Sequence, residues 1–274
     1  MEKILKIKNL LCGYKNSFQL EIINFEVDRG MFLGIIGPNG SGKSTFLKSL
    51  CSEIKIQRGT IYLNNCDLVS LTTKERAKRI AVVSQKMEVS YMKTEDYVLL
   101  GRLPYKSNFQ LFDSSTDTDI AHKYMNLCGV LNLKDKLLSE MSGGEQQLAS
   151  IAKALAQEPE LLLLDEPTSH LDLAHQMRIL NLLQKLNEEL NLSIIMIIHD
   201  LNLAAEFCKK LAIMKDGKIF TSGEASLVIN QKIIEEVYNT SVLIQINSFT
   251  QKPTVSLVSD KTYEKAHEGK VWIA

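Results

Sequence analysis

Residues 37–45 read GPNGSGKST and directly follow the apolar run MFLGII of residues 31–36. The segment from Gly37 to Ser44 fits the pattern G-x-x-x-x-G-K-[ST], and the apolar run before it is typical of a buried strand. The residues after it favour a helix that begins near Lys43. A strand, a glycine-rich loop and a helix in this order predict a loop that binds nucleotide phosphates. A plain glycine-rich turn or a fortuitous match would also fit the letters.

The residue types of this loop have separate uses. Gly37, Gly40 and Gly42 let backbone N–H groups turn towards phosphate oxygens, and a following helix adds the positive end of its dipole. We expect Lys43 to reach the β- and γ-phosphates of the nucleotide and the Ser44 hydroxyl to coordinate Mg²⁺. The residues of the loop that we expect to bind the nucleotide are Gly37, Pro38, Asn39, Gly40, Ser41, Gly42, Lys43, Ser44 and Thr45.

Composition limits the class of protein. The chain has 274 residues, 45% hydrophobic and 23% charged, which is enough for one large domain with a substantial core. It carries 32 basic and 32 acidic residues, a balance that gives no support to nucleic acid as a partner. Its five cysteines are scattered without a C-x-x-C pair, which favours reduced thiols over disulfides or a zinc site. We find no signal peptide and no apolar run near the roughly 18 residues of a membrane span, so we expect any membrane link to use a partner.

Short apolar runs alternate with segments of helical periodicity, and this indicates an α/β fold. The runs LLLL at 161–164 and IIMII at 194–198 do not alternate, which is typical of parallel strands buried on both faces. Amphipathic helices are predicted over residues 145–157 and 175–190. Strands are predicted over residues 20–27, 31–36, 60–63, 80–84, 161–166, 193–200 and 211–220, the last as a hairpin that turns at Asp216 and Gly217.

Two further segments divide the chain. Residues from about 87 to 158 contain no convincing strand, which predicts an inserted helical subdomain. Residues 241–274 favour short strands and predict a small C-terminal β extension. We therefore expect one α/β domain over residues 1–240, followed by this extension.

The run LLLLDEP places two carboxylates at the end of a buried strand. Asp165, at the mouth of the strand, is expected to hold Mg²⁺ beside Ser44. Glu166 would then lie near the terminal phosphate, where a carboxylate can polarise an attacking water. Two acids that merely cap a strand before Pro167 are the alternative, and the phosphate loop favours the functional interpretation.

A second anion site is predicted at MSGGEQQ, residues 141–147. Ser142, Gly143 and Gly144 stand before an amphipathic helix and offer a hydroxyl and two bare N–H groups at its positive end. The alternative is a serine N-cap with flexible glycines. One chain rarely needs two γ-phosphate cradles for one nucleotide, so this corner makes sense if it completes the site of another subunit.

The motifs GPNGSGKST, MSGGEQQ, LLLLDEP, SHLD and the histidine of IIHD occur in this order and together resemble the ATP-binding subunits of ABC transporters. The resemblance covers about residues 1–240. It implies a P-loop NTPase core with a mixed sheet, an N-terminal antiparallel β part and an inserted helical subdomain. It also implies ATP and Mg²⁺ as cofactors and a head-to-tail dimer of two copies of the chain.

The resemblance assigns roles residue by residue. Tyr14 matches an aromatic that stacks on adenine, and Gln85 matches a glutamine that contacts Mg²⁺ and the membrane subunit. Residues 142–144 match a signature that grips ATP across the dimer. Asp172 closes a loop that crosses this interface, and His199 matches a histidine that holds the γ-phosphate and the attacking water. From the residues alone, Tyr14 could be a surface aromatic, and Gln85 and His199 could be polar residues at strand ends.

Three stretches resemble the ATPases of importers for iron–siderophore complexes, haem and cobalamin: SHLDLAHQ at 169–176, VLLGRLPY at 98–105 and the tail from residue 246. This implies ATP hydrolysis coupled to uptake, permease partners, an indirect link to a substrate-binding protein, and a peripheral position on the cytoplasmic face of the membrane. The rivals are a soluble ABC-type ATPase not coupled to transport, a phosphotransferase with the same loop, and a binding module that does not turn over ATP.

Overall fold

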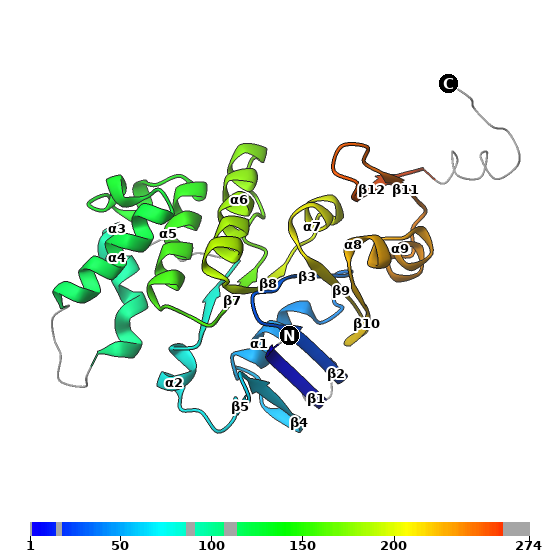
Figure 1. Ribbon diagram of the computed structural model, residues 1–274, viewed down its shortest axis with the longest axis horizontal. Coiled ribbons are helices and arrows are strands. Elements are labelled where there is room, and N and C mark those ends of the chain that lie inside the picture. The colour runs from blue at the N-terminus through cyan, green and yellow to red at the C-terminus, as the bar shows by residue number, and fades with distance from the viewer. Residues whose placement is uncertain (1, 15–17, 86–90, 107–113, 260–274) are drawn as a thin grey trace, which may run out of the picture.

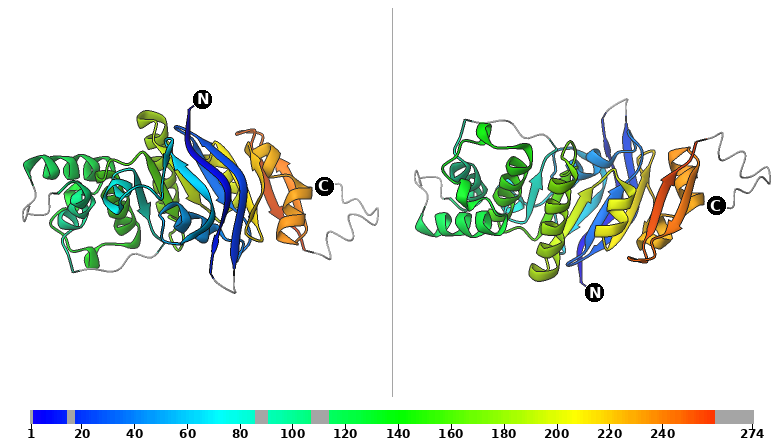
Figure 2. Two further views of the ribbon diagram at one scale, coloured as in Figure 1. Left: turned by 90° about the horizontal axis from the view of Figure 1, so that it is seen from below. Right: turned by 90° about the horizontal axis from the view of Figure 1, so that it is seen from above.

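The computed structural model describes residues 2–14, 18–85, 91–106 and 114–259. A six-stranded sheet forms the centre, with a second, antiparallel sheet on one side of it (Figure 1). A group of helices lies at one end of the molecule and a small two-stranded sheet at the other, as both views of Figure 2 show. The α/β class predicted from the sequence is confirmed.

The central sheet has the strand order β10-β9-β3-β8-β7-β6. The pairs of β3 with β8 and β9, of β7 with β8 and of β6 with β7 are parallel, whereas β9 and β10 form an antiparallel hairpin, so the sheet is mixed. All of these strands were predicted from the sequence. Their bounds are β3 Phe32–Ile36, β6 Ile80–Val83, β7 Leu161–Asp165, β8 Ser193–Ile197, β9 Lys210–Lys215 and β10 Lys218–Gly223.

The central strands are apolar because both of their faces are covered. In β7, Leu162 and Leu164 belong to one hydrophobic cluster, with helix side chains, and Leu161 and Leu163 belong to a second cluster, with residues of the antiparallel sheet. All four leucines have no exposed surface. The four leucines of the run LLLL therefore pack into two hydrophobic cores, one on each face of the sheet. This is the pattern expected of parallel strands that are covered by helices on one face and by a second sheet on the other.

The antiparallel sheet contains a strand that the sequence analysis did not predict. Its order is β2-β1-β4-β5, with β1 Lys3–Gly13, β2 Gln19–Asp28, β4 Ile56–Leu63 and β5 Cys66–Asp67. The alternation of β1 is broken where its register with β4 shifts between Lys8 and Leu11. Asn9, inside that shift, has a φ of 47°. Such a bulge disturbs the two-residue period on which strand prediction relies.

The helices are α1 Lys43–Leu50, α2 Thr73–Ala77, α3 Thr94–Leu99, α4 Ser115–Leu127, α5 Gly143–Ala156, α6 Leu173–Leu190, α7 Leu201–Phe207, α8 Ala225–Val228 and α9 Gln231–Tyr238. Short 3-10 turns cover Leu100–Tyr105, Leu131–Leu133 and Leu138–Glu140. Among the described residues from 91 to 156 there is no strand, only an isolated bridge between Lys93 and Leu137. The inserted helical part expected from the sequence is present. No helix in the described ranges is both long and apolar enough to span a membrane.

Arg102 anchors the helical part internally. It is 5% exposed, and its guanidinium donates to Asp117 of α4, to the carbonyl of Ala156 at the end of α5 and to Glu158. Asp117 is itself buried. One side chain in the motif VLLGRLPY therefore ties α4 to the end of α5 through a buried ion pair.

At the other end of the chain, β11 Val242–Ile246 pairs with β12 Pro253–Leu257. This hairpin packs on α7, where the Asn202 amide accepts from the backbone N–H of Val255 (2.7 Å) and donates to its carbonyl (3.3 Å). The short strands predicted for this extension are present, and its residues from 260 onward lie outside the described part of the chain.

Replacing Arg102 tests how much the helical part depends on it. Arg102→Ala leaves the buried Asp117 carboxylate without its guanidinium, so we expect the free energy of unfolding to fall by about 3–5 kcal/mol. Urea unfolding followed by circular dichroism measures this. Lys185→Ala, which removes an exposed pair with Glu189, is the control and should change stability by less than about 1 kcal/mol. Equal stability of the two variants would contradict the assignment.

Candidate functional site

The sheet topology brings the predicted site residues to one edge. The glycine-rich loop follows β3, His199 follows β8, Asp165 and Glu166 end β7, and Gln85 follows β6. These four strands are adjacent and parallel, so their carboxyl ends lie along the same edge of the sheet. That edge is where α/β sheets bind ligands.

A cavity lies at this edge and is lined by Phe18, Asn39, Gly40, Gly42, Lys43, Ser44, Thr45, Glu166 and His199. We call it the phosphate-loop cavity. Gly42 caps α1 with a φ of 101°, a left-handed conformation that favours glycine. A Cβ at Gly42 would lie 2.5 Å from the Phe18 ring, and one at Gly37 would lie 2.2 Å from the carbonyl oxygen of Met214. The loop therefore fits only as bare backbone at these two positions.

Lys43 is nearly buried at the floor of this cavity, with 6% exposure. Its ammonium donates to the carbonyls of Gly37 (2.8 Å) and Pro38 (2.9 Å), so the loop itself holds the charge in place. Burial lowers the pKa of Lys43, and the nearby carboxylates of Glu166 and Asp165 partly oppose this shift. A buried cation held among bare N–H groups is suited to a polyphosphate.

Asp165 and Ser44 form a pair that fits a divalent cation. Burial raises the pKa of Asp165, and a hydrogen bond with the Ser44 side chain opposes this effect. The Oδ1 atom of Asp165 is buried and has no hydrogen-bond partner among the described residues. A carboxylate oxygen without a partner beside a hydroxyl is the hard oxygen set that Mg²⁺ prefers. Ser44 and Asp165, two of the three predicted metal ligands, therefore lie together.

Glu166 joins the other catalytic candidates. Gln85 donates through Nε2 to Oε2 of Glu166 (2.7 Å), and Nε2 of His199 lies 2.5 Å from Oε1. The structure thus places Gln85 against Glu166. Glu166 has a φ of 50°, which is uncommon for a residue with a side chain and is found at functional positions. A carboxylate held between an amide and an imidazole, beside Lys43, can orient and polarise a water.

The signature residues lie outside the phosphate-loop cavity of their own chain. Ser142 caps α5, with its hydroxyl accepting from the Glu145 N–H (3.3 Å) and Glu145 bonding back to the Ser142 N–H (2.8 Å). Ser142 and Gly143 are exposed, and Gly144 is buried. The serine cap considered for this stretch is therefore present, and none of residues 142–144 lines the cavity.

Tyr14 and Asp172 also lie outside the lining of the phosphate-loop cavity. Tyr14 is 49% exposed, and its N–H donates to the carbonyl of Phe18. The aromatic ring that lines the cavity belongs to Phe18, which the sequence analysis missed because it lies four residues past the predicted position. Stacking of Tyr14 on adenine stays a prediction. Within the loop the Ser41 N–H donates to the Pro38 carbonyl (3.2 Å), and the buried Ser41 hydroxyl has no partner among the described residues.

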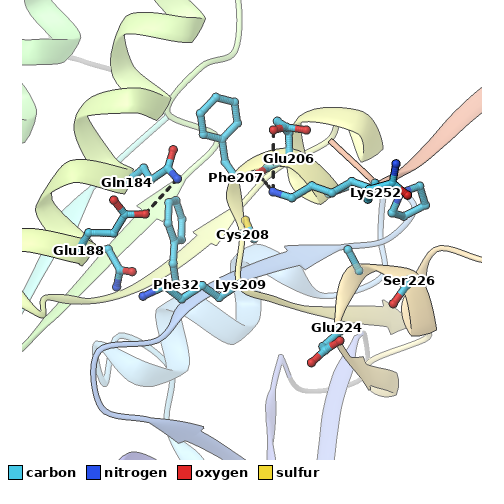
Figure 3. Close-up of a pocket in the computed structure, with 15 residues that line it drawn as sticks. Phe32, Gln184, Glu188, Glu206, Phe207, Cys208, Lys209, Glu224, Ser226 and Lys252 are labelled. Atoms are coloured by element: carbon cyan, nitrogen blue, oxygen red, sulfur yellow. Dashed lines mark hydrogen bonds and ion pairs between the residues drawn. The ribbon is translucent and has the colours of Figure 1, made fainter. Parts of the chain in front are cut away.

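A separate cavity lies between α6, α7 and the C-terminal hairpin (Figure 3). Gln184 and Glu188 of α6 bond to each other on one side, and Lys252 of the hairpin contacts Glu206 of α7 on the other. Phe32 and Cys208 line it as well. None of the predicted site residues lines this cavity, whereas all the residues that line the phosphate-loop cavity, except Phe18, are predicted site residues.

The raised pKa of Asp165 predicts an effect on stability. An acid with a higher pKa in the folded than in the unfolded protein weakens the folded state as the pH rises from about 4 through the folded value. Without Mg²⁺, Asp165→Asn is therefore expected to unfold at a higher temperature than the parent at pH 7–8, with a gain that shrinks towards pH 4. Calorimetric scans across pH measure this, with Asp119→Asn at an exposed position as the control. A lower melting temperature for Asp165→Asn at pH 7–8 would contradict the burial argument.

Comparison with known proteins places this site in a family. The sequence profile described as ABC transporter matches residues 20–169. The iron(3+)-hydroxamate import ATP-binding protein of Bacillus subtilis is 37% identical over 250 residues, which cover 91% of this chain and 93% of that protein.

Two solved structures extend the likeness to the fold. One, described as an inward-facing metal-chelate type ABC transporter, has a TM-score of 0.83 and 26% identity, and covers 95% of this chain and 99% of the other. A dimeric ATP-binding cassette in a post-hydrolysis state with ADP and phosphate has a TM-score of 0.68 and 28% identity, and covers 80% and 98%. The P-loop NTPase core predicted from the sequence is confirmed. The chain belongs to the family of ABC transporter ATP-binding subunits, whose reaction is the hydrolysis of ATP.

Proposed function

We propose that this chain is the ATP-hydrolysing subunit of an importer for an iron–siderophore, haem or cobalamin-type substrate. The observation that carries the proposal is the separation of two half-sites in one chain. The phosphate-loop cavity is lined by Lys43, Glu166 and His199, while the exposed corner at Ser142 and Gly143 does not line it. Two copies in head-to-tail orientation complete both sites.

Within such a site, the residues of this chain divide the work. Lys43 and the bare N–H groups of the loop hold the β- and γ-phosphates, and Ser44 and Asp165 would hold Mg²⁺, which supplies charge neutralisation at the phosphates when bound. Glu166 polarises the attacking water and His199 orients it. Glu166 keeps its contacts with Gln85 and with His199 and has further lone pairs that can accept a hydrogen bond from that water.

In the proposed dimer, ATP binding and hydrolysis change the distance between the two copies. ATP bound at Lys43 of one copy contacts the signature corner of the other, so binding draws the two copies together. Hydrolysis removes the shared γ-phosphate, and with it the contact that favours the closed state.

Membrane subunits would receive this motion near Gln85. The segment Leu100–Tyr105 exposes apolar side chains at Leu100 and Leu103, with 38% and 54% exposure. This segment belongs to the stretch VLLGRLPY, and the buried Arg102 fixes it to the rest of the helical part. We therefore propose permease subunits as partners, a substrate-binding protein as an indirect partner, and a peripheral position on the cytoplasmic face of the membrane. A soluble ATPase uncoupled from transport is the alternative, and association with a permease in membrane extracts distinguishes the two.

The dimer is tested with Glu166→Gln, which keeps the size of the side chain, removes the negative charge that polarises the water, and so slows hydrolysis. We expect this variant to form a stable dimer under saturating ATP and Mg²⁺ and to remain monomeric with ADP, as measured by analytical ultracentrifugation. A protein that stays monomeric with ATP contradicts the composite site.

The phosphate loop is tested with Lys43→Ala. Loss of the buried ammonium removes charge stabilisation from the transferring phosphoryl group, so we expect ATP hydrolysis to fall by at least about a hundredfold. Phosphate release measures this, with the exposed Lys232→Ala as a control that retains full turnover. Normal turnover by Lys43→Ala would show that the catalytic site lies elsewhere.

A further inference from the structure

The second glycine of the signature is in contact with a histidine from another helix. A Cβ at Gly144 would lie 2.1 Å from Cδ2 and 2.7 Å from Cγ of His175. Gly144 has an ordinary helical backbone and is absent from the positive-φ positions. In this arrangement the His175 ring occupies the space that a side chain at position 144 would need, so any larger residue there would displace the ring.

His175 is held in this place by Asp172. Its Nδ1 lies 2.9 Å and 3.0 Å from the two carboxylate oxygens of Asp172, and its backbone N–H donates to the same carboxylate at 2.8 Å. The backbone and side-chain hydrogen bonds from His175 hold the pKa of Asp172 below its usual range. Asp172 is therefore ionised at neutral pH and fixes the orientation of the ring. Asp172 is also the N-cap of α6 and ends the SHLD loop.

Each of the two loops is fixed to the helix that follows it. Gln176 of α6 donates to the carbonyls of Thr168 and Leu171, and these hydrogen bonds hold the SHLD loop, residues 169–172, against the helix. In the same way Gln146 of α5 donates to the carbonyls of Leu138 and Met141, just before the signature. These bonds act within each loop–helix unit. His175 reaches the other unit at Gly144, and Leu171 of the SHLD loop reaches it at Gly143, where a Cβ would lie 3.6 Å from Leu171 Cδ2; α5 and α6 lie side by side (Figure 1).

An ordinary explanation of His175 is a surface histidine that pairs with its own helix cap. The side chains of His175 and Asp172 are 35% and 67% exposed, and a pair this exposed contributes less than about 1 kcal/mol to stability. That explanation does not account for the close contact between the His175 ring and Gly144. The His175 ring packs against the start of the signature helix and is held in place by the SHLD loop. A side chain that connects the signature to the SHLD loop would need both of these contacts.

We propose that His175 is a positioning residue that locks the signature corner, residues 142–144, to the SHLD loop of the same chain. The proposal rests on the proposed dimer, in which both segments meet the partner copy. With the lock in place, the two segments approach the partner as one rigid surface, and less ordering is needed when the dimer closes. The ATP site within each chain, built on Lys43, does not use His175.

The test separates ATP binding from dimer closure. In the Glu166→Gln background, His175→Ala should bind ATP as a monomer with unchanged affinity, measured at low protein concentration with a fluorescent ATP analogue. The dissociation constant of the ATP-bound dimer should rise roughly tenfold, in the range of ordinary coupling between sites. A merely structural role would lower thermal stability and weaken both steps together.

Two conservative variants divide the contacts of His175. His175→Phe keeps a ring against Gly144 and loses the bond to Asp172, whereas His175→Asn keeps a donor near the Nδ1 position and loses the ring. Each variant should lie between the parent and His175→Ala in dimer dissociation constant. His122→Ala is the matched control, because it removes another histidine–carboxylate pair, with Glu95 of α3, and should leave dimerisation unchanged.

The outcomes distinguish this inference from the proposed function. If the Glu166→Gln parent never dimerises with ATP, the proposed dimer itself is wrong. If the parent dimerises and His175→Ala dimerises with the same dissociation constant, the role of His175 is overturned. A parallel loss of monomer ATP affinity and of dimerisation would also overturn it, because it would show general damage to the fold.

Discussion

Burial of the parallel strands on both faces is the constraint on which this molecule depends. Along β7, alternate leucines serve two different hydrophobic clusters, so a shift of one residue would exchange the two sets. The same holds for β3, where Phe32 and Ile36 face one cluster and Leu33 and Ile35 face the other. Because the register cannot slip, the residue that follows each strand has a fixed position at the edge of the sheet.

That edge concentrates charges that are costly to keep out of water. The Lys43 ammonium is buried and donates hydrogen bonds to two loop carbonyls, while one oxygen of Asp165 has no partner in the described structure. Glu166 has both oxygens engaged, by Gln85 and by His199. The side chains of the site thus satisfy one another, except at the Asp165 oxygen and, in the loop, at the Ser41 hydroxyl. In the proposed function, a nucleotide with a bound cation would satisfy the Asp165 oxygen.

Several elements show where sequence reasoning failed and why. The strand β1 was missed because its bulge at Asn9 breaks the alternation, and Phe18 was missed because nothing local distinguishes it from Tyr14. His175 had no recognisable spacing with another residue. Its significance comes from the Gly144 backbone, which lies 31 positions earlier in the chain and approaches the ring only when α5 and α6 pack together.

The sequence by itself determined the class of fold, the phosphate loop and the order of the motifs, because these depend on local spacing and on the apolar content of each strand. The resemblance to a family, and not the spacing of the residues, selected Gln85 and His199 as partners of Asp165 and Glu166. Only the tertiary structure decided which of them touch. Gln85 lies against Glu166, Phe18 lines the cavity, and His175 fills the space beside Gly144. These contacts join residues far apart in the chain, and their geometry is set by the packing of whole elements.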